Sequence, residues 1–149
     1  MYMVIRIQGM ETGGRIPARY TCDGEDIHPA LSFSGVPQEA RSLALLVDDP
    51  DSPSGNWTHW IIWRLSPAER EIAEGKIPAG AAEGMNDFGK TGYGGPCPGS
   101  GEHRYFFRLY ALREPLPLSP GASRKEFEDA CRGRIIAQAD TYGVYERER

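Results

Sequence analysis

The chain has 149 residues, of which 40% are hydrophobic and 26% charged, a balance typical of one soluble globular domain. Its formal net charge of −4 disfavours a general nucleic-acid or anionic-membrane surface. Eighteen glycines and twelve prolines interrupt most helical patterns and favour a turn-rich β protein. We therefore expect a single domain over residues 1–149, with no nucleic-acid partner.

The N-terminal segment carries Arg6 within its apolar residues and no small-residue cleavage site, and no stretch is long enough to span a bilayer. We expect a cytoplasmic protein without an integral membrane segment. Cys22, Cys97 and Cys131 are an odd set without a CxxC pair, which indicates neither a zinc framework nor a secreted disulfide scaffold. A Cys22–Cys97 bridge stays open because both lie in turn-rich segments, but three reduced thiols are expected in the cytoplasm.

Three strands are predicted before the first motif. Val4–Gln8 alternates between apolar and polar residues, and Leu31–Ser34 is a short strand that ends at Gly35. Ser42–Val47 is a continuous apolar run, which is typical of a strand buried on both faces. This run leads directly into an acidic, proline-stiffened turn over Asp48–Pro53.

Trp57–Leu65 alternates with period two and predicts an aromatic strand. The alternation places Trp57, His59, Ile61, Trp63 and Leu65 on one face, and Thr58, Trp60, Ile62 and Arg64 on the other. Ser66–Glu69 resembles a capping box with proline at the first helical position, so a turn or two of helix fits there.

Ile77–Gly101 is a long, glycine-rich loop, and Phe88 and Tyr93 favour its packing against the domain over disorder. Residues 84–91 (GMNDFGKT) match the phosphate-loop pattern G-x-x-x-x-G-K-[ST]. A phosphate loop needs a buried strand before it and a helix after it, and the flanking sequence predicts neither. We therefore reject a nucleotide site in this loop.

The last third predicts two strands and a helix. Glu102–Leu112 alternates, with His103, Tyr105, Phe107 and Leu109 on one face. Ser123–Glu126 is a capping box that opens a helix, Gly133 ends it, and Ile135–Tyr145 forms the last strand. The total of about seven strands predicts a mainly β protein: an antiparallel β-sandwich of two sheets with one or two short helices.

His59 and His103 each lie beside a turn, early in an aromatic strand. Two imidazoles facing one cavity could grip phosphate or a carboxylate, more strongly as the pH falls through their ordinary pKa of about 6.5. Tyr105 shares a face with His103 and can add its hydroxyl. The backbone amides of Gly94 and Gly95 can approach a ligand without interference from a Cβ atom. These residues predict a small anion pocket.

Other interpretations of the same residues stay open. Asp49 can orient a histidine or bind an amine or hydroxyl, but it also suits a turn in any protein. His59 on an apolar strand face can be a buried histidine bonded to backbone. Arg104 and Arg108 are expected to pair with acids on a sheet surface, and His28, before a proline, is expected to be exposed.

The same residues allow two enzymatic alternatives. His59, His103 and Asp49 could form a two-histidine, one-carboxylate metal site, although no spacing demands it. A nucleophilic hydrolase needs an activated Ser or Cys, and the chain has no G-x-S-x-G; Cys97 near His103 is a conceivable pair but a weak signal. We therefore expect no enzyme, no catalytic residues, no metal and no cofactor.

Six stretches resemble one known family in its order: residues 20–24 (YTCDG), 49–53 (DPDSP), 57–60 (WTHW), 87–93 (DFGKTGY), 95–96 (GP) and 101–105 (GEHRY). The chain resembles the phosphatidylethanolamine-binding protein family, also called Raf kinase inhibitor protein-like, and in particular its bacterial and archaeal branch. The resemblance implies a β-sandwich of two antiparallel sheets with a pocket for phosphate, phosphorylated headgroups or similar anions.

Carried over by position, the resemblance implies the following ligand-binding residues: Asp49, Trp57, His59, His103 and Tyr105 in the pocket, with Gly94, Gly95 and Pro96 at its rim. The expected function is non-enzymatic binding of a small anion, phosphate or phosphoethanolamine-like, with a regulatory role left open. The alternatives are a kinase or protease inhibitor or scaffold acting through surface loops, and a small metal- or thiol-dependent hydrolase. A homodimer is also left open.

Overall fold

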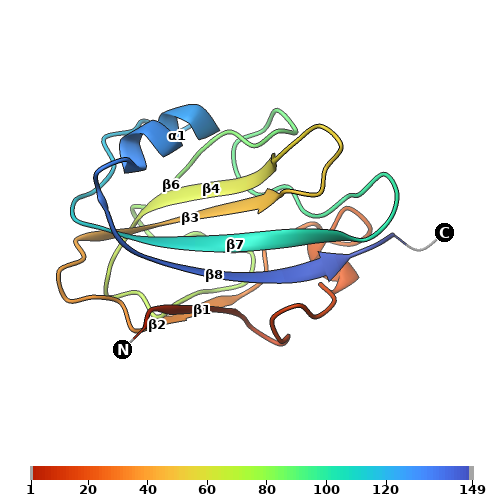
Figure 1. Cartoon of the computed structure of the whole chain (residues 1–149), viewed down its shortest axis with the longest axis horizontal. Helices are drawn as coiled ribbons and strands as arrows, with labels where there is room; N and C mark the ends of the chain where they lie inside the picture. The colour runs from red at the N-terminus through yellow and green to blue at the C-terminus, as the bar shows by residue number, and fades with distance from the viewer. Residues whose placement is uncertain (1, 148–149) are drawn as a thin grey trace.

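The computed structural model describes residues 2–147 and consists of two antiparallel sheets that pack face to face, with a helix on the outer side of the larger sheet (Figure 1). This is the predicted β-sandwich, so the expected fold class is confirmed. Among residues 2–147, no helix is long and apolar enough to cross a membrane.

The larger sheet has the strand order β6-β4-β3-β7-β8, and the smaller sheet has the order β1-β2-β5. The larger sheet consists of β3 (Ser42–Asp49), β4 (Trp57–Leu65), β6 (Ala82–Glu83), β7 (His103–Leu112) and β8 (Ile135–Tyr145). The smaller sheet consists of β1 (Val4–Ile7), β2 (Leu31–Ser34) and β5 (Glu71–Ile72). The helices are a 3-10 turn, η1 (Ala18–Tyr20), and α1 (Arg124–Cys131).

Two apolar layers hold the sheets and helix together. The first fills the space between the sheets, where Leu45 and Phe107 of the larger sheet meet Ile5 and Leu31 of the smaller one. The second lies between α1 and the opposite face of the larger sheet, where Phe127 packs with buried strand residues. Because β3 is central and covered on both sides, all eight of its residues are buried, as its unbroken apolar run predicted.

Most elements begin and end where the sequence patterns place them. The bounds of β2, β4 and β8 agree with the prediction, and β1 and β7 differ by one residue. The capping box of α1 is formed, because Ser123 Oγ accepts from the Glu126 amide and the Glu126 carboxylate accepts from the Ser123 amide. Ser66–Glu69, in contrast, makes a turn without helix, and the two-residue strands β5 and β6 were not predicted.

The predicted faces of β4 are wrong between Trp60 and Trp63, and Leu65 again lies on the predicted face. Its pairing with β3 skips His59 and shifts again near Arg64, whose φ is +60°. Each shift is a β-bulge, which adds one residue and reverses the alternation that follows. As a result, Trp60, Ile62 and Leu65 face the core between the sheets, whereas Ile61 and Trp63 face α1.

Cys22 and Cys97 form a disulfide that joins segments 75 residues apart, with Cα atoms 5.4 Å from each other. The expectation of three reduced thiols is therefore wrong, and Cys131 alone among the three is a buried free thiol. The spacing in the sequence left this bridge open, and the fold brings the two turn segments together. The Cys22 amide also donates to the Pro96 carbonyl (3.1 Å), so backbone and side chain join the same two segments.

The long loop after β5 is packed, as its aromatic residues predicted. Residues 84–91 form a turn in which Asn86 Oδ1 accepts from the amides of Phe88 and Lys90. The short strand β6, which the flanking sequence did not predict, precedes this turn, and residues 92–102 after it are irregular. His28, expected to be exposed, is buried and stacked on Trp60 with ring centroids 4.5 Å apart.

Candidate functional site

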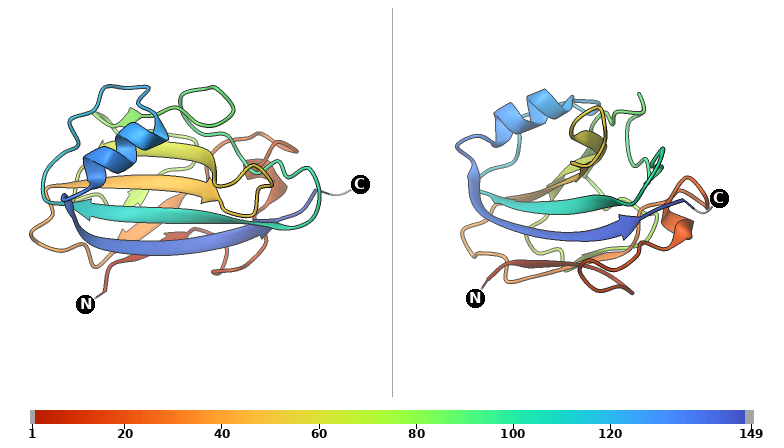
Figure 2. Two further views of the ribbon diagram at one scale, coloured as in Figure 1. Left: turned by 45° about the horizontal axis from the view of Figure 1, so that its top comes forward. Right: turned by 45° about the vertical axis from the view of Figure 1, so that its right-hand side comes forward.

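A cavity of about 180 Å³ lies where the turn after β3, the start of β4 and the segment before β7 meet. Those segments lie together at one end of the larger sheet (Figure 2). The lining residues are Asp49, Ser52, Pro53, Trp57, His59, Phe88, Cys97, Pro98, Gly99, His103 and Tyr105. The cavity therefore contains both predicted histidines, together with Asp49, Trp57 and Tyr105.

His103 is held by a carboxylate. Its Nδ1 donates to Asp49 Oδ2 at 2.6 Å, and both side chains are buried. The other oxygen, Asp49 Oδ1, accepts from the Asp51 amide at 2.8 Å, so the carboxylate is fixed at both oxygens. Asp49 thus orients a histidine, one of the two roles considered from the sequence, and the bond leaves Nε2 of His103 for other partners.

His59 is held by the backbone. Its Nδ1 donates to the Gly94 carbonyl at 2.6 Å, and in return the Gly94 amide donates to the His59 carbonyl at 2.9 Å. Burial lowers the pKa of His59, although the bond to Gly94 and the nearby carboxylate of Asp49 raise it. The ring therefore favours the neutral form, and it lies edge-on to Tyr105.

Tyr105 supplies a hydroxyl with an unmet hydrogen-bonding capacity. Its ring lies edge-on to His59, with centroids 5.2 Å apart, and is stacked with His103 at 6.3 Å. The hydroxyl oxygen is buried, and no group within residues 2–147 bonds to it. Burial, followed by the charge of Asp49, raises the pKa of Tyr105, so the phenol keeps its proton.

Trp57 and Phe88 make the aromatic side of the cavity. Their rings meet edge to face at 5.5 Å, and Phe88 also contacts His59 at 5.4 Å. Phe88 is 43% exposed, so it lies at the mouth of the cavity. The sequence suggested packing for Phe88 but gave no signal that it borders the site.

Gly94, Gly95 and Pro96, expected at the rim, are not among the residues that line the cavity. The Gly94 amide is used by His59, and the Gly95 amide donates to Asp26 Oδ1 at 2.7 Å. The expectation that these amides face a ligand is wrong, because both are already bonded within the protein. The next three residues, Cys97, Pro98 and Gly99, form the wall.

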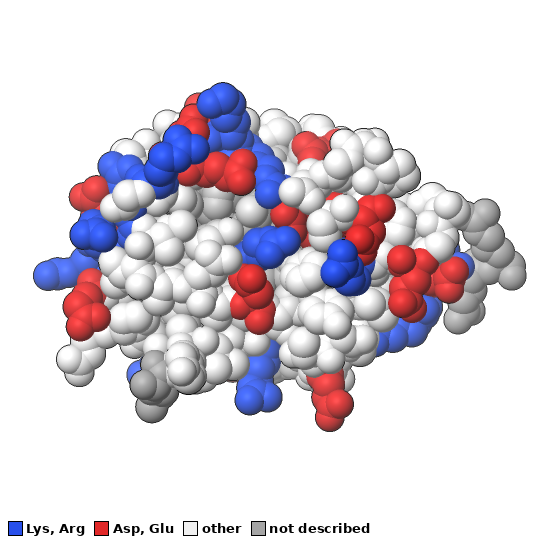
Figure 3. Space-filling view, viewed as in Figure 1, with Lys and Arg blue, Asp and Glu red and all other residues white. Residues whose placement is uncertain are grey.

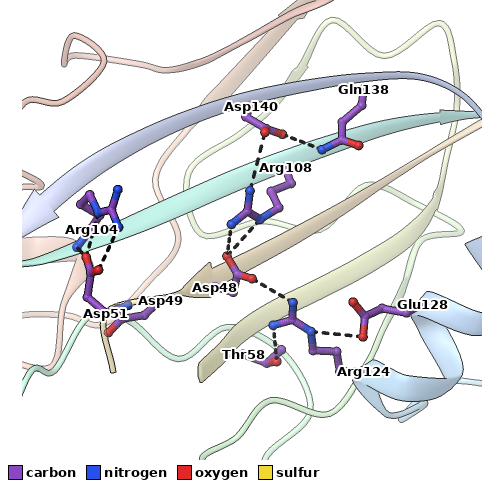
Figure 4. Close-up of polar contacts among 10 residues, drawn as sticks. All are labelled: Asp48, Asp49, Asp51, Thr58, Arg104, Arg108, Arg124, Glu128, Gln138 and Asp140. Atoms are coloured by element: carbon purple, nitrogen blue, oxygen red, sulfur yellow. Dashed lines mark hydrogen bonds and ion pairs between the residues drawn. The ribbon is translucent and has the colours of Figure 1, made fainter. Parts of the chain in front are cut away.

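Neighbouring acids and arginines are paired outside the cavity (Figure 4). Arg104 makes two side-chain bonds to Asp51, each of 2.9 Å, and holds the pKa of that carboxyl at about 2. Asp48, buried in β3, bonds Arg108 and Arg124, so it ties β7 and α1 to the centre of the sheet. The expected pairing of Arg104 and Arg108 with acids is confirmed.

The arginines and lysines around α1 are also interspersed with acids. Figure 3 shows them on the outer face of the helix, where Lys125 and Arg132 both pair with Asp129. The cavity itself has a different character: its lining contains one carboxylate, two histidines and neither lysine nor arginine. Within residues 2–147, no three His, Cys, Asp or Glu side chains are grouped as a metal site would require.

Comparison with known proteins adds independent findings. Residues 6–146 match the family model described as phosphatidylethanolamine-binding protein. A UPF0098 protein of Methanothermobacter thermautotrophicus is 50% identical over 150 residues, covering 97% of this chain and 99% of the relative. A UPF0098 protein of Aquifex aeolicus is 46% identical over 153 residues, covering 98% of this chain and 90% of the relative.

Two crystal structures have the same fold over nearly the whole chain. One, from Chlamydia trachomatis, is titled a phosphatidylethanolamine-binding protein homolog; it is 42% identical, covers 99% of both chains and has a TM-score of 0.94. The other, YbcL of Escherichia coli, is titled a new member of the mammalian family; it is 30% identical, covers 99% of this chain and 100% of its own, and has a TM-score of 0.92.

Proposed function

Because the chain belongs to the phosphatidylethanolamine-binding protein family, we propose that its cavity binds a small oxyanion, such as phosphate or a phosphorylated headgroup. The protein acts by binding, without catalysing a reaction. The family membership supports a binding role, and the polar groups in the cavity support an oxyanion as the ligand.

The buried hydroxyl of Tyr105 is the observation that carries this proposal. A buried polar group without a hydrogen-bond partner destabilises the fold. In native proteins such a group is usually bonded to a water molecule, an ion or a ligand. The ring that carries this hydroxyl contacts the rings of His59 and His103, whose Nδ1 atoms are both already bonded. A ligand oxygen in the cavity would satisfy the hydroxyl and meet the free ring nitrogens at once.

The proposal of a non-enzymatic role rests on Cys97 and Asp49, the two side chains in the cavity that could assist a histidine in catalysis. Cys97, the thiol considered as a nucleophile, lines the cavity but is bonded to Cys22. A disulfide sulfur has no thiolate with which to attack a substrate. Asp49 and His103 form a pair that could orient a base, yet such a pair also fixes a binding geometry.

Isothermal titration calorimetry with inorganic phosphate tests the proposal. Tyr105→Phe removes one hydrogen bond to a charged ligand, so we expect an affinity about 10-fold weaker. Tyr110→Phe is a matched control: it removes a half-buried hydroxyl from the same strand, outside the cavity, and keeps the wild-type affinity. No heat of binding in the wild type, or equal losses in both variants, would refute an oxyanion site at Tyr105.

We also propose the cytoplasm as the compartment, as expected from the sequence. The Cys22–Cys97 disulfide is the observation against which this proposal has to be tested, because disulfides are rare in reducing compartments. Alkylation of free thiols in intact cells, followed by mass spectrometry, would show whether Cys22 and Cys97 are bridged there.

The homodimer and the role as an inhibitor or scaffold remain predictions. The large apolar side chains that are exposed come from separate segments of the chain: Tyr2, Ile77, Met85, Phe88 and Ile135.

A further inference from the structure

We propose that the cavity selects oxyanions that carry an acidic proton, such as phosphate and phosphate monoesters, over sulfate and phosphate diesters. The inference rests on the proposed function, because it concerns the ligand of the same cavity. It follows from the hydrogen-bonding roles that the fold assigns to His59 and from the charges of the side chains that line the site.

The bond to Gly94 fixes which nitrogen of His59 carries the proton. A carbonyl oxygen can only accept, so Nδ1, 2.6 Å from the Gly94 oxygen, must be the protonated nitrogen. In a neutral imidazole the other nitrogen, Nε2, then has a lone pair and can only accept. Within residues 2–147 no hydrogen bond reaches Nε2, and His59 lines the cavity. A ligand therefore meets an acceptor at His59.

The surroundings of His59 keep the ring neutral. Burial opposes a charge on the ring and outweighs three carboxylates that favour one: Asp48 and Asp49 of β3, and Asp87 of the following loop. From β7, the uncharged phenol of Tyr105 faces the ring edge-on. A ligand that carries its own proton thus needs no change in the charge of His59.

The lining charges also disfavour a fully deprotonated anion. Asp49 is the one carboxylate in the lining, and the nearby arginines are used elsewhere, Arg104 by Asp51 and Arg108 by Asp48. His103 donates through Nδ1 to Asp49, so its Nε2 is a donor when the ring is charged and a second acceptor when it is neutral. When His103 is neutral, a fully deprotonated anion meets two ring acceptors and the hydroxyl of Tyr105; when His103 is charged, His59 still presents an acceptor. In both states the carboxylate of Asp49 is a like charge close by.

A protonated phosphate matches these roles. Its P–OH group donates to His59 Nε2, while an unprotonated oxygen accepts from the Tyr105 hydroxyl. Sulfate has nearly the same size and shape but no proton near neutral pH, so its oxygen would face the lone pair of His59. A site built to bond one proton rejects the analogue that lacks it, because a buried group is left unpaired.

Calorimetry at about pH 6 with inorganic phosphate, sulfate, methyl phosphate and dimethyl phosphate tests the inference, since monoesters lose their last proton near this pH. We expect phosphate to bind at least about 10-fold tighter than sulfate, and methyl phosphate to exceed dimethyl phosphate similarly. Equal affinities for phosphate and sulfate would overturn the inference and leave the oxyanion site intact. Binding by none of the four would overturn the proposed function itself.

Two further measurements remove the remaining ambiguities. His59→Gln can turn an amide N–H₂ toward the ligand, so its phosphate-to-sulfate ratio should fall toward one, whereas Tyr110→Phe should keep the wild-type ratio. Wild-type protein suffices for the second measurement: at about pH 8 methyl phosphate has lost its last proton, so its binding should take up a proton, seen as a dependence of the binding heat on the buffer's ionisation enthalpy. Binding of methyl phosphate without proton uptake at this pH would contradict the inference, whether or not the His59→Gln variant folds.

Discussion

Asp48 and Asp49 are neighbours in β3, yet their carboxylates meet different partners because successive side chains of a strand point to opposite faces. Asp48 lies on the α1 side and binds Arg108 and Arg124. Asp49 lies on the cavity side and binds His103. One step along the chain thus separates a carboxylate that joins β7 and α1 to β3 from one that orients His103 in the cavity.

His59 makes the stability of the protein depend on pH. Because burial lowers its pKa in the folded state, the unfolded chain binds the proton more readily, and the free energy of unfolding decreases as the pH falls below the ordinary value of about 6.5. We expect the wild type to lose more stability between about pH 8 and about pH 5 than His59→Gln, which cannot titrate.

Urea unfolding at the two pH values measures this difference. The other titratable groups contribute equally to both proteins, so the difference between the two pH dependences isolates His59. An identical loss of stability in the wild type and in the variant would show that the ring is as easily protonated in the fold as in water.

Among the elements, β4 shows how local irregularity positions the site. A regular strand would have placed His59 and Trp60 on opposite faces. The bulge at His59 lets the imidazole reach Tyr105 at the cavity while Trp60 enters the core between the sheets. Bulges often lie next to functional sites, where they redirect a side chain.

The segment behind the cavity depends on a glycine that allows close approach. A Cβ atom on Gly95 would overlap the carbonyl oxygen of Tyr20 and crowd Asp26. We expect Gly95→Ala to lower the free energy of unfolding by about 1–3 kcal/mol, in the range of overpacking, and to weaken phosphate binding by displacing His59 through Gly94. Thermal unfolding and calorimetry measure the two effects.

Gly99→Ala is the matched control for that variant. Gly99 lies four residues further along the same segment, and a Cβ atom there meets nothing within 4 Å. Its stability should therefore remain close to that of the wild type. Equal destabilisation by the two substitutions would mean that the segment tolerates no alanine at all, independently of the contact with Tyr20.

At the scale of the whole molecule, the Cys22–Cys97 bridge closes a loop that includes all strands from β2 to β6. Such a cross-link stabilises a fold mainly by limiting the unfolded chain. We expect the double variant Cys22→Ser/Cys97→Ser to lose about 2–4 kcal/mol of stability in urea unfolding. Reduced wild-type protein should match the variant. If the oxidised and reduced proteins unfolded at the same urea concentration, the bridge would contribute nothing to stability.

The amino-acid sequence by itself determined the longer elements of the fold, though not the two-residue strands β5 and β6. Period-two alternation defined β4 and β7, a continuous apolar run defined the doubly covered β3, and a capping box defined α1. The motif residues Asp49, His59, His103 and Tyr105 were also predicted to converge, and they line one cavity. These signals are local, because side-chain period, turn chemistry and capping depend on residues only a few positions apart.

Only the tertiary structure decided how those elements use their polar groups. The bulges in β4, the bonds that occupy the amides of Gly94 and Gly95, the burial of His28 and the Cys22–Cys97 bridge all depend on partners far away in the sequence. Such partners leave no periodic pattern, since a backbone carbonyl or an amide has the same chemistry at every position. For this reason the sequence predicted where the cavity residues lie, whereas the fold decided which of their atoms remain for a ligand.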